Sequence, residues 1–299
     1  MIIKKLFMII FCTLFFCSVI EAKTGTYAMS FIDLVNTPYS ASLSNAVTAV
    51  SDSKAMYINP ASIANNKKMI VSAQLFDYLV DIQFKEFRIA QPYLGGNIAL
   101  SYTWVDYGTY QATTHDDMLG GSSGLVKNKS SMLQLTYAKH LAKYQVGSSI
   151  KYLLDQLASY EADCIALDFG VQRSLGTQWM IGASMTNIGL KKVKYIDESA
   201  KIRALSRVGI QYTPIFFKSN MSMMFDYTLR NKDELVYSVG TTFRAHENFN
   251  IHLGTSDFSD LFGFSIGLGI KKGDLGINLS LKQQKEFSDI YRLSLSMEL

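Results

Sequence analysis

Hydrophobic and polar residues alternate along the last stretch of the chain, from Tyr291 to Leu299. Every odd position there is apolar and every even position is polar. Successive side chains of a β-strand point to opposite faces, so the stretch predicts a strand with one apolar and one polar face. Similar segments of about ten residues, the length of transmembrane strands, follow one another from Met69 onward. Fourteen strands are predicted, near residues 69–77, 80–91, 96–107, 131–140, 144–156, 162–174, 177–188, 203–213, 219–229, 234–245, 248–255, 262–271, 274–283 and 287–299.

The two faces of these predicted strands differ in composition. In one of the clearest, Leu275, Ile277, Leu279 and Leu281 alternate with Gly276, Asn278, Ser280 and Lys282. A soluble sandwich, with its apolar faces packed together, is the alternative for any single strand. The even number of strands, the continuous apolar face and the Gly, Ser, Asn, Asp, Lys and Arg on the other face favour an all-β fold, a 14-stranded antiparallel transmembrane β-barrel.

The composition supports a membrane barrel. The chain has 4 Pro and 4 His against 17 Tyr and 18 Phe. Charged residues make up 18% of it, below the ~25% usual in soluble proteins. The formal net charge is only +4, and no run of Lys and Arg occurs, so a nucleic-acid partner is not expected.

The first 22 residues have the pattern of a cleaved export signal. Lys4 and Lys5 precede an apolar run from Leu6 to Ile20, and Ala22 supplies a small residue for cleavage. We therefore expect the mature chain to begin near Lys23 and to be exported.

Cysteine usage and hydropathy limit the alternatives. Cys12 and Cys17 would leave with the signal, so Cys164 would have no disulfide partner and no cysteine-based metal site is expected. No later run is long enough to cross a bilayer as a helix, so a membrane location requires a closed barrel.

Residues 23–68 lack the alternation and are rich in Ser, Ala and Asn. We expect them to form a short plug or periplasmic cap, ahead of an outer-membrane barrel over residues 69–299. A helix is predicted within Ser40 to Val50, and another turn is predicted to start at Ser51-Asp52-Ser53. Asn59-Pro60-Ala61 must interrupt the preceding structure, because a residue before Pro is extended. Either Pro60 fixes a plug whose movement opens a route for a hydrophobic ligand, or it only seats the segment as a rigid turn.

The links between the predicted strands alternate in length, as in barrels whose long loops face outward. The links Gly108–Ser130, Gln156–Glu161 and Gly189–Ile202, after the third, fifth and seventh strands, are predicted to be the longer ones. Leu141-Ala142-Lys143, Leu175-Gly176 and Lys272-Gly273 are predicted to be tight turns on the other side.

The last strand is predicted to close the barrel against the first, around Met69–Asp77. Its apolar end resembles the signal that barrel-insertion machinery recognises, so that machinery and outer-membrane lipid are expected partners. The residues of this predicted insertion signal are Tyr291, Leu293, Leu295, Met297 and Leu299.

Polar residues on the non-lipid face are candidates for a functional passage. They are Lys151, Asp168, Asp226, Arg244, Arg292 and Glu298. An internal ladder of ion pairs that stiffens the barrel is the alternative, since a polar interior is required whatever the function. The aromatic residues predicted to form girdles at the membrane interfaces are Tyr102, Trp104, Trp179, Tyr212, Tyr227 and Tyr291.

The sequence contains no enzyme motif, and no cofactor or metal site is predicted. His115 beside Asp116 and Asp117 is the most metal-like group, but it lies in a Gly-rich link and is better interpreted as a solvated loop tip.

Several N-terminal segments resemble the PorV/PorQ family of outer-membrane proteins, itself similar to the FadL long-chain fatty acid transporters. The resemblance rests on Ser30-Phe31, Pro38-Tyr39-Ser40-Ala41, Ala46-Val47-Thr48-Ala49-Val50-Ser51-Asp52, Ala55-Met56-Tyr57-Ile58-Asn59-Pro60-Ala61, Asp81-Ile82-Gln83-Phe84, Asp106-Tyr107-Gly108 and Thr186-Asn187-Ile188-Gly189-Leu190. It implies a 14-stranded barrel with the N-terminal segment inside or beneath it.

Two non-enzymatic functions follow from the resemblance. The PorV/PorQ group implies a component of a type IX-like protein secretion and attachment machinery, in contact with secretion proteins or cargo. The FadL group implies, as the alternative, transport of hydrophobic small molecules across the outer membrane.

Overall fold

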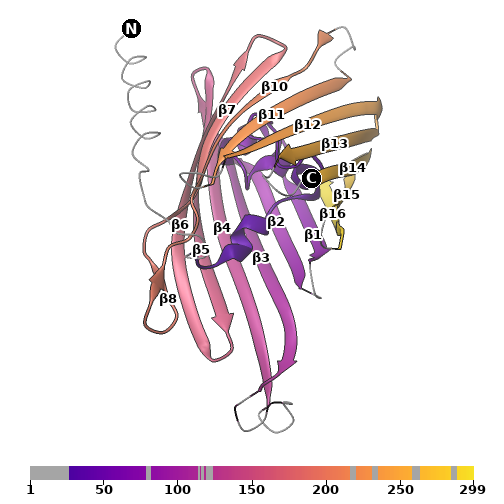
Figure 1. The fold of residues 1–299 in the computed structure, drawn as a ribbon. Coiled ribbons are helices and arrows are strands. Elements are labelled where there is room, and N and C mark those ends of the chain that lie inside the picture. Colours follow the sequence, from indigo (N-terminus) through magenta and orange to yellow (C-terminus); the bar gives the residue numbers. More distant parts are fainter. Residues whose placement is uncertain are drawn as a thin grey trace.

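The computed structural model describes residues 27–78, 82–113, 115, 118, 124–215, 220–230, 235–257, 263–283 and 288–299. The predicted export signal lies outside these residues, as do Asp116 and Asp117. Fourteen strands form one closed antiparallel barrel (Figure 1). They are β1 (Ile70–Asp77), β2 (Gln83–Tyr93), β3 (Gly96–Gln111), β4 (Leu125–Leu141), β5 (Tyr144–Leu157), β6 (Tyr160–Leu175), β7 (Trp179–Gly189), β10 (Leu205–Tyr212), β11 (Met221–Leu229), β12 (Leu235–His246), β13 (Phe249–Asp257), β14 (Gly263–Lys272), β15 (Leu275–Lys282) and β16 (Ile290–Glu298).

The barrel closes where it was predicted to close. β1 pairs with β16 from Ile70 opposite Glu298 to Phe76 opposite Arg292, and the Leu299 amide donates to the Met69 carbonyl at 2.8 Å. We call this junction, with the adjoining strand β2, the seam side of the barrel. The fourteen-stranded prediction is thereby confirmed.

The apolar face of each strand points outward. Leu133, Phe169, Phe225 and Leu253 are examples, each between 41% and 50% exposed, while the inward positions are mostly buried. An apolar surface that faces outward would be unstable in water but is stable in a lipid bilayer, as in transmembrane barrels. The alternative of a soluble sandwich is therefore wrong. Among the described residues, no helix has the length and hydropathy to cross a membrane.

The two ends of the barrel differ in their connections. At one end, which we call the turn end, two-residue turns such as Leu94-Gly95 and Gly273-Asp274 join the strands. The other, the loop end, carries the long links 112–124 and 190–204, the second containing a small hairpin of β8 (Val193–Lys194) and β9 (Ser199–Ala200). Short turns face the periplasm in barrels of this kind, so the turn end is the periplasmic end.

The predicted long link after the fifth strand is wrong. β5 and β6 remain paired up to Leu157 opposite Tyr160, leaving a two-residue turn in which Ala158 has φ 55°. The predicted link after the third strand is also shorter than expected, because β3 and β4 continue beyond a bulge to Gln111 opposite Leu125. Strands β3 to β6 therefore extend further at the loop end than the other strands, which Figure 1 shows toward its lower edge.

The segment before the barrel is made of short helical turns. These are η1 (Ser30–Leu34), α2 (Pro38–Ser42), η2 (Ser53–Ala55) and η3 (Pro60–Asn65). The predicted helix over Ser40–Val50 ends early, because Ser44 and Asn45 have φ 50° and 65° and leave the right-handed region. The turn predicted at Ser51-Asp52-Ser53 is present, with the Asp52 side chain accepting from the Lys54 amide as its N-cap.

Candidate functional site

Residues 27–66 lie inside the barrel, and we refer to them as the plug. Figure 1 shows them as the indigo and purple segment enclosed by the strands. At the loop end, the Ala28 amide donates to the backbone carbonyl of Lys201, in the link before β10, at 3.0 Å. At the turn end, the chain continues directly into β1. The plug therefore runs along the lumen from one end to the other.

Seven inward-facing glycines, here called the glycine belt, bring the wall against the plug. They are Gly147, Gly170, Gly182, Gly209, Gly240, Gly254 and Gly267, on strands between β5 and β14. A Cβ at Gly254 would lie 2.4 Å from the Leu43 carbonyl carbon, and one at Gly182 would lie 2.2 Å from the Thr48 carbonyl oxygen. No Cβ fits at such distances, so glycine is needed at these positions for contact between two backbones.

Asn59 and Pro60 sit over two belt glycines on adjacent strands. The Asn59 Oδ1 accepts from the Ala61 amide at 3.0 Å and so caps η3, in which Pro60 takes the first position. The Asn59 Nδ2 donates to the Thr48 carbonyl at 2.7 Å. One fully buried side chain thus starts one element of the plug and ties it to another.

Side chains of the wall bind both backbone groups of Thr48. Its amide donates to Asp226 Oδ2 at 2.8 Å, and its carbonyl accepts from Gln172 Nε2 at 2.9 Å. Gln172 also donates to the Val50 carbonyl at 2.9 Å. Buried backbone groups that lack regular secondary structure need such partners, because an unpaired one costs about 1–3 kcal/mol.

Apolar side chains gather in the loop-end part of the lumen along β1 to β5 and β16. The large inward apolar side chains of the wall gather there, namely Phe76, Phe84, Val105, Met132, Leu153 and Ile290, all buried. Phe76 and Phe84 are stacked with ring centroids 4.4 Å apart. Ile32 and Val35 of the plug belong to the same buried cluster. The plug therefore fills an apolar space at this end.

The turn-end part of the lumen is polar and hollow. A cavity of about 560 Å³, here called the vestibule, lies between the plug and the turn-end wall, from β13 through the seam side to β2. Its wall residues include Ser72, Arg88, Asn278, Ser294, Ser296 and Glu298, and its plug residues include Thr37, Ser53 and Lys54. Lys68 and Asp274, an exposed ion pair at 2.9 Å, mark its mouth at the turn end.

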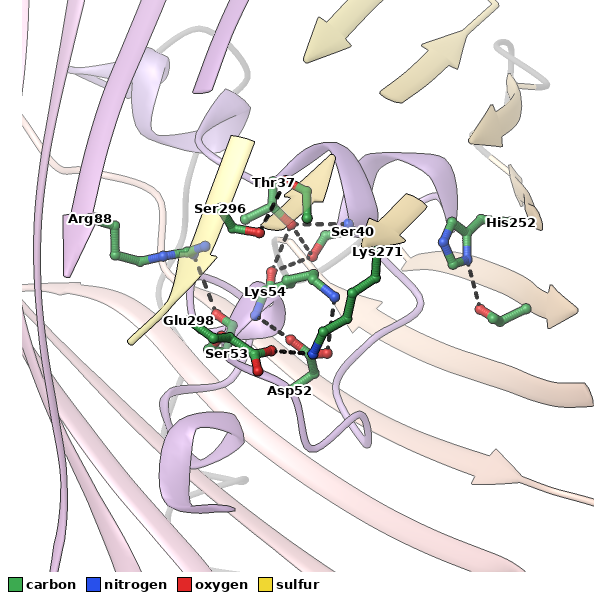
Figure 2. Close-up of polar contacts among 12 residues, drawn as sticks. Thr37, Ser40, Asp52, Ser53, Lys54, Arg88, His252, Lys271, Ser296 and Glu298 are labelled. Carbon is green, nitrogen blue, oxygen red and sulfur yellow. Dashed lines mark hydrogen bonds and ion pairs between the residues drawn. The ribbon is translucent and has the colours of Figure 1, made fainter. Parts of the chain in front are cut away.

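Figure 2 shows the contacts around the vestibule. Thr37 and Ser40 both donate to the Lys54 carbonyl, at 2.7 and 3.0 Å, and so hold α2 against η2. Arg88 reaches from β2 to the Ser53 carbonyl at 3.3 Å. Lys271 and Glu298 form an ion pair at 2.6 Å on the wall. The plug surface here is held together by its own hydroxyl groups and held to the wall by a long side chain.

One layer above Arg88, a second pair of groups closes the lumen. Gln74 Nε2 donates to the Asn36 carbonyl at 3.0 Å, and opposite it Glu86 accepts from the Tyr57 hydroxyl at 2.6 Å. Burial raises the pKa of Tyr57 well above its ordinary value, and the charge of Glu86 acts in the same direction. The tyrosine therefore keeps its proton and remains a donor to Glu86 throughout the ordinary pH range.

Lys151 and Asp168 form a buried ion pair at 2.8 Å on the inner wall. Lys151 also donates to Asn187 Oδ1 at 2.7 Å, and Asp168 Oδ1 accepts from the Asn187 amide at 2.8 Å. Asn187 has φ 61° and lies in a bulge of β7. The pair thus fixes a local irregularity of the wall, and beside it lies a small cavity of about 30 Å³.

The other predicted lumen residues have separate surroundings. Asp226 holds the plug, and buried Arg292 places its guanidinium 3.6 Å from the Phe76 ring centroid and donates to the Leu34 carbonyl at 3.4 Å. Glu298 lines the vestibule, whereas Arg244 is exposed at the turn-end tip of β12. The six residues thus do not form one group: Lys151 pairs with Asp168, and the other four lie apart from that pair with partners of their own or at the surface.

The predicted girdle and insertion-signal residues lie on the outer face. Tyr102 stacks on Trp104 with ring centroids 5.6 Å apart, and Trp179 stacks on Tyr212 at 4.2 Å. The insertion-signal residues are between 40% and 66% exposed: Tyr291, Leu293, Leu295, Met297 and Leu299. Their recognition by insertion machinery stays a prediction.

Sequence reasoning missed the glycine belt and the polar side chains that hold the plug. The belt has a signal in the sequence, since each of its glycines falls on the non-lipid positions of a predicted strand. Gln74, Arg88 and Gln172 fall on those positions too, but nothing in their spacing indicates a partner on the plug. In the parts of the chain that are described, no group of three His, Cys, Asp or Glu side chains is placed to hold a metal ion.

No family model and no curated protein matches the chain. Among solved structures, the chain is similar to a CymD monoaromatic hydrocarbon channel, with a TM-score of 0.63, 13% identity, and 89% of this chain and 98% of that chain covered. It is similar to the toluene transporter TodX of Pseudomonas putida, with a TM-score of 0.61, 10% identity and coverage of 88% and 96%. It is also similar to a FadL homologue of Pseudomonas aeruginosa, with a TM-score of 0.60, 10% identity and coverage of 88% and 98%.

At such low identities these similarities establish the fold. They confirm the FadL-like part of the predicted resemblance. Together with the outward apolar belt, the fold confirms the predicted location in an outer membrane.

Proposed function

We propose that the protein is a channel for small hydrophobic molecules across the outer membrane, closed at rest by its plug. The observation that carries the proposal is the apolar loop-end lumen, where Phe76, Phe84 and Met132 form a buried surface on the side from which such molecules would enter. The lumen is thus polar at the vestibule and offers, at the loop end, an apolar surface into which an entering hydrocarbon would partition.

The fold similarity supports the same function. The solved neighbours are described as a monoaromatic hydrocarbon channel and a toluene transporter. The role in protein secretion implied by the PorV/PorQ resemblance stays a prediction, since the comparisons do not show that family.

Uptake of radiolabelled toluene tests the proposal, in cells whose own outer-membrane channels have been deleted. Cells that express the protein should take up toluene faster than cells with an empty vector, and should show a much smaller gain for glucose. Phe84→Ser should reduce the toluene gain, provided that heat-modifiable gel migration shows a folded barrel. Equal toluene uptake with and without the protein would refute the function.

A further inference from the structure

The wall of the barrel offers no exit to the side within the described residues. Each of the fourteen strands is hydrogen-bonded to both of its neighbours, and the bulges that follow Asp106 on β3 and lie opposite Asp168 on β7 are within paired strands. A molecule that travels through the lumen from the loop end to the turn end must therefore pass the plug.

The barrier beside the plug is thinnest on the seam side. Along β1, Phe76 belongs to the apolar loop-end lumen, Gln74 bonds the plug, and Ser72 already lines the vestibule. The strand rises about 3.4 Å per residue, so the apolar space and the vestibule are separated by only about 14 Å. On β2 the order is the same, from Phe84 to Arg88.

On the seam side, side chains of the wall close this barrier. Gln74, Arg88 and Arg292 donate to single plug carbonyls at 3.0, 3.3 and 3.4 Å, and Glu86 accepts from the Tyr57 hydroxyl at 2.6 Å. On the opposite side the belt glycines bring wall and plug backbones together, which leaves no room for displacement. Long side chains can change rotamer, whereas two backbones in contact cannot give way locally.

We propose that the plug opens on the seam side only, with Gln74, Glu86 and Arg88 as the latch, and that molecules leave through the vestibule to the periplasm. This inference rests on the proposed function for the nature of the cargo. The face of the plug on the glycine belt stays seated during passage, so the plug hinges and does not leave the barrel.

A matched pair of glutamine variants tests the latch. Gln74→Leu and Gln172→Leu each remove a buried amide that donates to plug carbonyls, the first on the seam side and the second on the belt side. The proposal expects Gln74→Leu to raise the ion conductance of the protein in planar bilayers about fivefold, the shift given by loss of one ordinary hydrogen bond. Gln172→Leu should lower the melting temperature without that rise. Equal conductance in the two variants, or a larger rise in Gln172→Leu, would overturn the latch.

A second pair tests the route. Ser294→Trp places a large ring in the vestibule, whereas Leu295→Trp, on the next residue, faces lipid. With both barrels folded, toluene uptake should fall to the empty-vector level in Ser294→Trp and stay unchanged in Leu295→Trp. Unchanged uptake in Ser294→Trp would overturn the vestibule route while leaving the channel function intact. Absence of uptake by the wild-type protein would instead refute the function, and the conductance of the glutamine variants would still decide on the latch.

Discussion

The two sides of the lumen hold the plug in different ways. On the belt side, seven inward positions of the wall are glycines and have no side chain. The backbone of β13 therefore lies against Leu43, and that of β7 lies against Thr48. On the seam side, the wall keeps long polar side chains that span a gap to the plug and leave the vestibule below them. The difference indicates that a single enclosed segment is fixed along one side and releasable along the other.

The largest effect is expected at the buried ion pair of the belt-side wall. Lys151→Met should destabilise the barrel by about 3–5 kcal/mol, because it leaves the Asp168 carboxylate buried without its partner. Lys271→Met removes the partner of Glu298 on the vestibule wall, where both side chains are partly exposed, and should cost less than about 1 kcal/mol. Thermal unfolding in detergent, followed by the gel shift, compares the two. Similar losses of stability in the two variants would contradict a difference between the buried belt-side wall and the wall of the vestibule.

Alanine in place of glycine gives the next largest difference. Gly254→Ala should cost about 1–3 kcal/mol, because its Cβ meets the Leu43 backbone. Gly269→Ala, on the adjacent strand and also facing inward, should cost less, since the nearest atoms to its Cβ are all in side chains, those of His252 at 3.1 Å, Asn278 at 3.4 Å and Asn250 at 3.7 Å. Digestion by trypsin at Lys54 measures the seating of the plug directly. Faster cleavage in Gly269→Ala than in Gly254→Ala would contradict the assignment of the belt.

Asn59 sharpens the comparison within the plug itself. Asn59→Ala removes both the cap of η3 and the donor to Thr48, and should cost about 0.5–2 kcal/mol. Asn59→Ser keeps an uncharged oxygen that can accept from the Ala61 amide and loses the amide donor to Thr48, so its loss should be smaller if the cap dominates. A Ser variant as unstable as the Ala variant would place the larger share in the bond to Thr48.

The smallest effect is expected at the mouth of the vestibule, where the hydrogen bond from Lys68 lowers the pKa of Asp274 and raises that of Lys68. The stabilisation by Asp274 is complete above its unfolded pKa, about 3.9, and is lost as the pH falls through its lowered folded value. That by Lys68 is complete below its unfolded pKa, about 10.4, and is lost as the pH rises through its raised folded value.

Melting temperatures of the wild type and Asp274→Asn across this range provide the test. Because both groups are fully exposed, the two proteins should differ little at neutral pH, and their curves should converge at both extremes. A large difference in melting temperature at neutral pH would show that the Lys68–Asp274 ion pair at the mouth stabilises the fold substantially.

The strands could be predicted because a lipid-facing wall forces alternation on each of them. The pairing of the last strand with the first followed from the same pattern, since both end strands of the sheet need partners, and the structure sets its register with Ile70 opposite Glu298. Local backbone choices were less visible. Ala158 at φ 55° closes a turn where a loop was expected, and Ser44 and Asn45 end a helix early. Ala and Ser seldom adopt the left-handed conformation, and a single Asn is too weak a signal to predict it.

The candidate site could be predicted only in part. The break at Asn59-Pro60 was visible, because Pro restricts its neighbour wherever it occurs. The partners of Asn59 were not, because Thr48 reaches it through a turn and Gly170 lies more than a hundred residues away. The role of Gln74 was hidden for the same reason, since a polar interior position is satisfied by many partners and alternation identifies the face without the contact.

The bond between Ser44 and Ser265, 221 residues apart, carries a consequence for the order of assembly. The plug precedes every strand that will hold it, and its contacts with β10 to β14 have to wait until those strands have been made and brought round. Contacts between such distant residues form slowly. The sheet must therefore curl around a segment already gathered in its concave side, and pairing of β1 with β16 then encloses that segment. We expect that a plug that is outside the sheet when β1 pairs with β16 cannot enter the barrel afterwards. The yield of closed barrels that contain the plug would then depend on assembly and not on the stability of the final fold.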